Sequence, residues 1–460
     1  MPKKYDVVIV GAGPAGIFTA LELTKIKGLK VLILEKGEDI DKRFCPARKE
    51  GCPCQRCSPC SLLSGWGGAG AFSDGKLNLS PQIGGQLNNY LKEEELKELI
   101  NYVDGIYLKF GAPKRVYGDN EDEIDEIRRR ATLAELQLQS SKIRHTGTEK
   151  CFQILKKMRE HLKDKIEIHS QVEVKKILLE KGKVSGVETK EGKKIYTNYL
   201  VVAPGREGAN WLTQEAHRLH LKTFGNPVDV GVRVEVPAEV LEFFTQIAYE
   251  LKLVFFSSSF DDKVRTFCMC PYGEVVTEYN NGITTVNGHS YRGKKTPNTN
   301  FALLVSTSFT DPFHEPIAYG QYLARLANLL GGGVIIQRLG DLIDGRRTNW
   351  ERIERGIVKP TLKEATPGDL SFALPYRYLS DILEMLKAMD VIAPGINSRH
   401  TLLYGIEVKF YSSRLELSSS LETKVKGLFA SGDGAGITRG LVQASASGVA
   451  VGREIAKRVK

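Results

Sequence analysis

A glycine-rich loop near the N-terminus is the first segment whose residues are suited to binding a ligand. Gly11, Gly13 and Gly16 form a G-x-G-x-x-G pattern between an apolar segment and a segment with helical periodicity. Gly11 permits a tight turn, Gly13 lets backbone amides approach a pyrophosphate, and Gly16 lets helix and strand pack closely. The helix N-terminus favours the negative charge of phosphate. The pattern predicts a dinucleotide phosphate site that also includes Pro14 and Ala15.

An acidic residue follows at the position that this pattern requires. Glu35 ends the second predicted strand, residues 30–35, where its carboxylate can accept hydrogen bonds from ribose hydroxyls. A carboxylate there repels a 2′-phosphate and therefore argues against NADP. We expect the neighbouring Lys36 to contact the cofactor as well. The loop by itself does not distinguish NAD from FAD.

Five of the eight cysteines lie between residues 45 and 60. Cys54, Cys57 and Cys60 have C-x-x-C-x-x-C spacing, which can hold one face of an iron–sulfur cluster, and tetrahedral zinc accepts the same thiolates. Cys45 is the expected fourth ligand, with Cys52 as the alternative. A disulfide and free thiols are the other interpretations. The segment predicts a metal or redox site.

Three further side chains are candidate catalytic residues. His289 lies in a polar Asn-Gly-His-Ser turn, while Glu407 and Lys409 alternate along one predicted strand. Alternation puts both charges on one face of that strand. We expect them to line a substrate cavity as acid, base or anion anchor. A turn histidine and an ordinary salt bridge are the alternatives.

The elements around these residues indicate an α/β fold. Residues 5–10 are apolar enough for a buried strand, and with the helix after Gly16 and the strand at 30–35 they form a βαβ unit. Strands joined by hairpin turns are predicted between residues 165 and 203. The C-terminal segment is again predicted to form a strand, a glycine turn and a helix. We therefore expect a Rossmann-like domain with a β-meander.

Later segments resemble known flavoprotein motifs. Residues 197–205 are similar to the strand and turn that follow the β-meander in many two-dinucleotide-fold flavoproteins. Residues 427–436 are similar to the strand whose Gly-Asp holds the ribityl chain and pyrophosphate of FAD. Residues 64–77, 286–291, 300–305 and 403–412 narrow the resemblance to the uncharacterised FAD-dependent dehydrogenases, a family related in fold to geranylgeranyl reductases. The similarity runs over nearly the whole chain.

This resemblance implies a glutathione-reductase-type FAD fold with an inserted α+β substrate domain, and FAD as the cofactor. We expect further cofactor contacts from residues in the later motifs, namely Gly70, Ser73, Asp74, Lys76, Val174, Ala203, Gly205, Gly432, Asp433 and Gly440. The FAD-binding domain is predicted to consist of three segments, 1–80, 141–222 and 396–460. Residues 81–140 are predicted to form a helical insertion, and residues 223–395 a substrate or cap domain.

The same resemblance implies a dehydrogenase or reductase that moves a hydride between flavin N5 and a small organic substrate. A flavin monooxygenase and a nucleic-acid-associated flavoprotein of the tRNA-modifying type are the alternatives. Only one complete dinucleotide fingerprint is present. We therefore expect the electron donor, NAD(P)H or a redox protein, to dock transiently.

The charge and apolar content of the sequence limit which kinds of partner the protein is expected to have. The net charge of +10 is spread along the chain, which is typical of a solvated surface, so no nucleic-acid partner is expected. No apolar run approaches the roughly 18 residues of a membrane span. The apolar run after the N-terminus is predicted to be a strand and not a signal peptide. The expected location is the cytoplasm.

Overall fold

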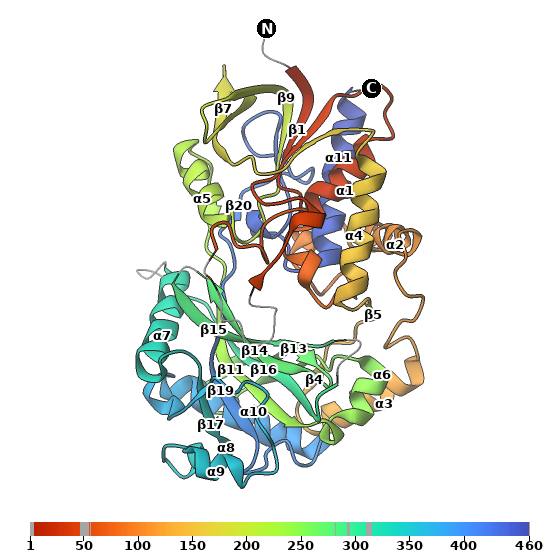
Figure 1. Ribbon diagram of the computed structural model, residues 1–460. Helices are drawn as coiled ribbons and strands as arrows, with labels where there is room; N and C mark the ends of the chain where they lie inside the picture. Colours follow the sequence, from red (N-terminus) through yellow and green to blue (C-terminus); the bar gives the residue numbers. More distant parts are fainter. Residues whose placement is uncertain are drawn as a thin grey trace. The chain divides into compact units, whose positions relative to one another are not determined.

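The computed structural model divides the chain into two compact units (Figure 1). Unit 1 comprises Met1–Arg115, Arg144–Asn226 and Tyr411–Lys460, and unit 2 comprises Val116–Ile143 and Pro227–Phe410. The structure describes residues 4–46, 55, 57–280, 282–291, 295–309 and 315–459.

Unit 1 is built on a seven-stranded sheet in the order β6-β2-β1-β9-β8-β7, with β21 also paired to β9. The parallel strands are β1 (Lys4–Val10), β2 (Val31–Leu34), β6 (Glu167–His169), β9 (Lys194–Val202) and β21 (Leu428–Ala430). β1 and β2 are almost wholly apolar and buried, as expected for strands covered on both faces. The predicted Rossmann-like fold is confirmed.

The predicted β-meander forms the edge of this sheet opposite β6. Strands β7 (Val174–Glu180) and β8 (Lys183–Thr189) run antiparallel to one another, and β8 pairs antiparallel with β9. Lys181 and Gly182 connect β7 to β8, and both have positive φ. A two-residue hairpin turn of type I′ requires positive φ at both positions, which glycine adopts without strain.

Helices α1 (Pro14–Leu23) and α11 (Leu441–Val459) lie side by side in unit 1, red and blue in Figure 1. They approach so closely at Gly448 that a Cβ added there would lie 2.1 Å from the Ala15 carbonyl oxygen. The remaining elements of the unit are η1 (Ile40–Lys42), η3 (Gly68–Phe72), β3 (Lys76–Asn78), η4 (Leu87–Asn89), α2 (Glu93–Lys109), β5 (Ile143–His145, which starts in unit 2), α4 (Thr148–Leu162), α5 (Ala209–Arg218), β10 (Thr223–Phe224), β20 (Arg414–Leu415) and η7 (Asp433–Ala435).

Unit 2 is built on an eight-stranded sheet in the order β18-β17-β19-β11-β16-β13-β12-β4. All neighbours are antiparallel except β17 and β18. The strands are β4 (Gln137–Leu138), β11 (Val228–Pro237), β12 (Leu253–Phe256), β13 (Lys263–Cys270), β16 (Asn298–Thr307), β17 (Ile335–Arg338), β18 (Thr366–Pro367) and β19 (Leu402–Lys409).

The two faces of this sheet differ in chemistry. Valines at even positions of β11 join an apolar core with the helices α3 (Glu121–Leu133), α6 (Glu242–Ala248), α7 (Pro316–Gly331) and α10 (Tyr376–Ile392). Odd positions of β11 carry Asp229, Arg233 and Glu235, all buried. Because side chains alternate along a strand, these charges lie together on the opposite face.

A hairpin of β14 (Glu274–Asn280) and β15 (Ile283–His289) packs on the charged face. A Cβ added at Gly288 of this hairpin would lie 1.8 Å from Arg233 Nη2, so only glycine fits there. The remaining elements of unit 2 are η5 (Ala238–Val240), α8 (Leu339–Ile343), α9 (Trp350–Glu354) and η6 (Leu370–Phe372). The charged face is therefore enclosed.

The predicted segments fall on this architecture as follows. Within residues 81–140, α2 lies in unit 1 and α3 in unit 2. Residues 396–410, with β19, lie in unit 2, and unit 1 resumes at Tyr411. Within the described part of the chain, no helix has the length and apolar character needed to cross a membrane.

Candidate functional site

The predicted phosphate loop connects β1 to α1. Gly11 has φ +103°, and a Cβ on it would lie 2.2 Å from the Ala203 carbonyl oxygen. A Cβ on Gly16 would lie 2.0 Å from the Gly11 oxygen, whereas one on Gly13 would meet nothing within 4 Å. No side chain caps the N-terminus of α1, and Pro14 occupies its first turn. The helix therefore presents backbone donors to an open side of the loop.

A second glycine loop, residues 65–70, lies against the first. Gly67 N donates to the Ala12 carbonyl oxygen at 2.7 Å. A Cβ on Gly68 would lie 3.2 Å from Gly13 Cα, and one on Gly70 would lie 2.8 Å from Leu441 Cδ2. This second loop therefore touches the starts of both α1 and α11. We call residues 11–16, 65–70, 203–205 and 432–440 the cradle.

Glu35 connects three segments of unit 1 from its position after β2. Its carboxylate accepts hydrogen bonds from Ala12 N and Gly37 N, both at 2.8 Å, and from Gly65 N at 2.9 Å. The side chain is 6% exposed. A carboxylate has about four acceptor positions. One position is thus left for a ribose hydroxyl, and the other three hold the loops in place.

Arg43 is a positioning residue that sequence reasoning missed. Its guanidinium donates to the carbonyl oxygens of Ser61, Leu62, Trp66 and Gly68 at 2.6–3.2 Å. Burial lowers the pKa of Arg43 to about 10, opposed by the Glu35 carboxylate. The fork of Arg43 holds residues 61–68 in one conformation, and a basic residue in a polar loop gives no signal of that role.

The C-terminal motif closes the cradle. Gly432 has φ +77°, and a Cβ on it would lie 3.0 Å from Ala15 Cβ, while one on Gly434 would lie 2.5 Å from the Gly205 oxygen. Asp433 accepts a hydrogen bond from Thr438 at 2.6 Å, which leaves acceptor positions unused. The hydroxyl of Ser431 is buried and has no partner among the described residues. Segments far apart in sequence thus converge beside α1.

A third connection was also missed from the sequence. Gln443 on α11 donates to the carbonyl oxygens of Pro81 at 3.0 Å and Ile83 at 3.1 Å. Gln86 N donates to the Ile437 oxygen at 2.8 Å, and Arg439 N donates to the Gly84 oxygen at 2.8 Å. These bonds hold residues 81–86 against residues 437–443. The pair Gly84-Gly85 was the one signal that could have revealed this contact.

The other predicted cofactor residues also lie in unit 1. Ser73 donates to the Gly70 oxygen at 3.0 Å, and Lys76 Nζ lies 3.3 Å from Asp74. Lys36 pairs with Glu207, which also accepts a hydrogen bond from Ser64 at 2.5 Å. Three more predicted residues have a backbone role: Ala203 N donates to the Val10 oxygen, Val174 begins β7, and Gly440 precedes α11.

These residues fit FAD. A pyrophosphate needs backbone donors and no side chain in its path, and Gly13 with the uncapped start of α1 supplies both. A ribose needs an acceptor, and Glu35 keeps one position open. A ribityl chain needs further polar partners, which Asp433 and the unpartnered Ser431 can supply. The described donors and acceptors therefore match the pyrophosphate, the ribose and the ribityl chain of FAD.

Unit 2 brings two predicted catalytic residues together. Lys409 Nζ lies 2.9 Å from Glu407 and 4.0 Å from Glu278. Glu407 is fully buried and also contacts Arg233, whose Nη1 lies 3.3 Å from both carboxylate oxygens. Burial alone would lower the pKa of Arg233, but attraction to Glu407 keeps it above its ordinary value. The guanidinium is therefore charged within the sheet.

Asn300 completes this cluster, and His289 follows Gly288, the residue of the hairpin that contacts it. Arg233 Nε donates to Asn300 Oδ1 at 2.9 Å, while Asn300 Nδ2 is buried with no partner among the described residues. His289 ends β15, where its ring lies 4.7 Å from that of Tyr291. Because Gly288 contacts Arg233, alternation turns the next side chain toward the opposite face of the hairpin. The structure thus pairs Glu407 with Lys409 and leaves the role of His289 a prediction.

The predicted metal segment is only partly described. Cys52 and Cys54 lie outside the described residues. Cys57 is exposed, and Cys60 is half-buried beside the Arg43 guanidinium. Within the described ranges, no three His, Cys, Asp or Glu side chains are grouped so that they could hold a metal ion.

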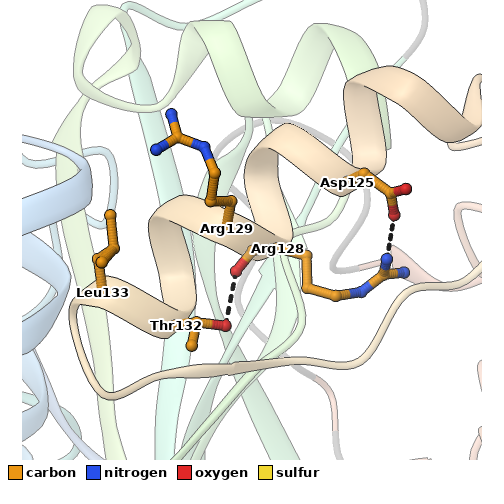
Figure 2. A pocket seen from close by; sticks show the side chains of 5 residues that line it. All are labelled: Asp125, Arg128, Arg129, Thr132 and Leu133. Carbon is orange, nitrogen blue, oxygen red and sulfur yellow. Dashed lines mark hydrogen bonds and ion pairs between the residues drawn. The ribbon is translucent and has the colours of Figure 1, made fainter.

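A surface depression on α3 has no such chemistry. Asp125, Arg128, Arg129, Thr132 and Leu133 line it, and all five come from one helix (Figure 2). Arg128 pairs with Asp125 and accepts the Thr132 hydroxyl through its carbonyl oxygen. Exposed pairs at helical spacing contribute little energy and are typical of a solvated face.

Comparison with known proteins found two family models that match separate parts of the chain. Residues 227–410 match the family model described as "FAD-dependent protein, C-terminal domain-like", and residues 5–127 match the model "Pyridine nucleotide-disulphide oxidoreductase". An uncharacterized protein of Clostridium beijerinckii (strain ATCC 51743 / NCIMB 8052) is 30% identical over 484 residues, which cover 99% of this chain and 81% of the relative.

Solved structures are similar at much lower identity. Glycine oxidase from Bacillus cereus ATCC 14579 is 16% identical, with 99% of this chain and 95% of that chain covered and a TM-score of 0.39. An R554A variant of formate oxidase from Aspergillus oryzae RIB40 is 13% identical, with 99% and 98% covered and a TM-score of 0.45.

Proposed function

This chain belongs to the family of FAD-dependent oxidoreductases, and on that basis we propose that it moves a hydride between FAD and a small organic substrate. When bound, FAD supplies the hydride acceptor or donor. The observation that carries the proposal is the cradle, in which loops from across unit 1 leave backbone donors facing an open space at Gly13.

In this proposal, residues of unit 1 bind FAD. Backbone amides at the start of α1 would bind the pyrophosphate, because the helix N-terminus favours negative charge. The remaining acceptor position of Glu35 would bind a ribose hydroxyl, and Asp433 would accept from the ribityl chain. Arg43 acts indirectly, since it holds the glycine loop that lies against Gly13.

The handling of the substrate is assigned to the charged face of unit 2. Lys409 is 11% exposed and sits between two carboxylates, so its Nζ can hold a proton or contact an anionic group. Glu407 fixes the position of Lys409, and Arg233 neutralises Glu407 from the other side.

The cysteine segment belongs to the same proposal. Cys54, Cys57 and Cys60, with Cys45 or Cys52 as the fourth ligand, are proposed to hold an iron–sulfur cluster or zinc because of their spacing. Metal and sulfide analysis of anaerobically purified protein tests this. A Cys57→Ser, Cys60→Ser double variant is expected to lose the metal, and wild-type protein without metal would rule the site out.

Reduction kinetics test the assignment of Lys409. Substrates are screened anaerobically by bleaching of the flavin absorbance, and hits are repeated with Lys409→Met and Lys409→Arg. A lost proton donor lowers the rate by roughly 10²-fold or more, and Arg is expected to restore binding (KM) but not the rate. Wild-type rates in Lys409→Met with full flavin content would remove Lys409 from the mechanism. Turnover that requires both oxygen and NAD(P)H would indicate a monooxygenase instead.

A further inference from the structure

Two cysteines, Cys268 and Cys270, lie at the end of β13 in unit 2, and the proposed hydride transfer uses neither of them. Both are present as thiols. Cys270 is fully buried, whereas Cys268 is half-buried, so part of Cys268 is open to solvent. The pair therefore combines an accessible thiol with an enclosed one.

A bulge in β13 brings these two residues toward each other. Phe267 pairs with Ala302 of β16 and Cys270 pairs with Asn300, so three steps along β13 match two steps along β16. Cys268 has φ +47°, a left-handed conformation that residues other than glycine adopt infrequently. In an extended strand, Cα atoms two residues apart are separated by about 6.7 Å, close to the upper limit for a disulfide of about 6.8 Å. The bulge shortens this segment, so the two cysteines fall within the limit.

Both cysteine side chains lie on the charged face of the sheet. Met269, between them, belongs to the apolar core of unit 2, so alternation turns its two neighbours to the opposite face. Cys270 Sγ lies 3.4 Å from the Cys268 carbonyl oxygen, which shows that the Cys270 side chain is turned back toward Cys268. The two sulfurs thus face the same side of the sheet, as a disulfide between them requires.

Arg233 supplies a positive charge to this pair. Its Nη2 donates to the Cys268 carbonyl oxygen at 2.7 Å and lies 3.5 Å from Cys270 Sγ. Burial alone would lower the pKa of Arg233, but attraction to Glu407 and to the thiolates of Cys270 and Cys268 raises it. By the same attraction the guanidinium favours the thiolate forms of the cysteines, which are the nucleophiles of thiol–disulfide exchange.

We propose that Cys268 and Cys270 are a redox-active pair that exchanges electrons with disulfide compounds from solution. The Cys268 thiolate attacks the outside disulfide, forms a mixed disulfide with one half of it and releases the other half as a thiolate. The Cys270 thiolate then attacks the Cys268 sulfur, closes the Cys268–Cys270 disulfide and releases the second half. Two electrons pass to the outside compound, and its two thiolates take up the two protons that the cysteines lost.

The short spacing makes this disulfide easy to reopen. A ring closed across a single intervening residue is strained, and strained disulfides are reduced more readily than structural ones. Outside thiols reopen the pair by the same steps in reverse. The exchange requires no flavin, so it is independent of the proposed hydride transfer and is tested separately.

Glutathione is the probe, and mass spectrometry is the measurement. The purified full chain is incubated anaerobically in mixtures of reduced and oxidised glutathione, alkylated and digested with trypsin. Peptide 266–292 contains Cys268 and Cys270 and no other cysteine. We expect it to change from two alkylated thiols to an internal disulfide as the share of oxidised glutathione rises, and to change back when the share falls. Cys151, a thiol whose pKa burial raises to about 11, is the internal control and should stay reduced.

Two variants test the separate roles of the cysteines. Cys270→Ser is expected to retain glutathione on Cys268, because no second thiol displaces it. In Cys268→Ser, the enclosed Cys270 is expected to react with oxidised glutathione about tenfold more slowly than Cys268 does in Cys270→Ser, or slower still. A wild-type peptide that keeps both thiols in every mixture, or that carries glutathione without forming the internal disulfide, would overturn the proposal. This wild-type titration decides the matter even where a variant does not fold.

Discussion

Some side chains of this molecule, such as Glu35, hold loops in place and also face the proposed cofactor site. The glycine spacing and Glu35 could be recognised from sequence, because the turn, the strand and the acid are local features. The amide partners of Glu35 could not, because Gly65 comes from a loop thirty residues away. Arg43 gives no local signal at all, since its acceptors are backbone carbonyl groups placed by tertiary packing.

Replacing Glu35 therefore has two effects. Glu35→Ala is expected to weaken FAD binding at least tenfold, about 1.4 kcal/mol. It also leaves three buried amides without their acceptor, so the free energy of unfolding should fall by about 3 kcal/mol or more. Flavin titration and urea unfolding of the apoprotein measure the two effects. Glu180→Ala, at an exposed end of β7, is the control, and equal results for both variants would contradict the assignment.

Replacing Arg43 tests a role that requires the guanidinium fork. Arg43→Lys keeps the charge but cannot reach the carbonyl oxygens of both Ser61 and Trp66. We expect a loss of about 1–3 kcal/mol in stability and faster hydrogen exchange in residues 61–70. Arg129→Lys on exposed α3 should change neither. Unaltered exchange in Arg43→Lys would show that the loop holds its own conformation.

Asp381 predicts a distinctive pH dependence of stability. Its pKa is raised to about 6 in the folded protein, so folding favours the protonated carboxyl. This contribution is complete below the unfolded pKa of about 4 and is lost as pH rises through about 6. Asp381→Asn should therefore have a Tm a few degrees above wild type at pH 8 and close to it at pH 4. The same difference at both pH values would mean that Asp381 does not titrate in this range.

Individual elements follow from local pattern more readily than their pairing does. The βαβ unit and the meander were predictable because buried strands are apolar and their connections are short hairpins or one helix. The eight-stranded sheet of unit 2 was not, since β11 pairs with β16 and β19 across long stretches of sequence. The charged face arises only from that pairing. Arg233, Asn300 and Glu407 come from three different strands and meet only in the sheet.

The close packing of α1 against α11 at Gly448 gives a prediction about stability and FAD retention. In Gly448→Ala the new Cβ must push α11 away from the Ala15 oxygen, which moves the start of α1. We expect about 1–3 kcal/mol of destabilisation and weaker FAD retention. Gly105→Ala, in α2 where a Cβ meets nothing within 4 Å, should stabilise by about 0.5–1 kcal/mol. Unchanged stability and FAD retention in Gly448→Ala would show that the two helices can separate without a cost in free energy.

At the scale of the whole molecule, holding the cofactor and handling the substrate are assigned to different units. Residues proposed to bind FAD all lie in unit 1, and the Arg233, Glu407 and Lys409 cluster lies in unit 2. The two functions should therefore separate by mutation. Lys409→Met is expected to keep its flavin and lose turnover, whereas Glu35→Ala loses flavin first. Loss of flavin in Lys409→Met would place that residue in the wrong role.

FAD binding is tested most directly by the absorption spectrum of the purified full chain, with the flavin identified after its release. We expect a yellow protein that carries FAD, not FMN, at close to one molecule per chain, and whose spectrum bleaches reversibly on anaerobic reduction. The cradle matches a pyrophosphate and a ribose, which FMN lacks. Protein that is colourless and takes up no FAD on reconstitution would show that the cradle does not bind FAD.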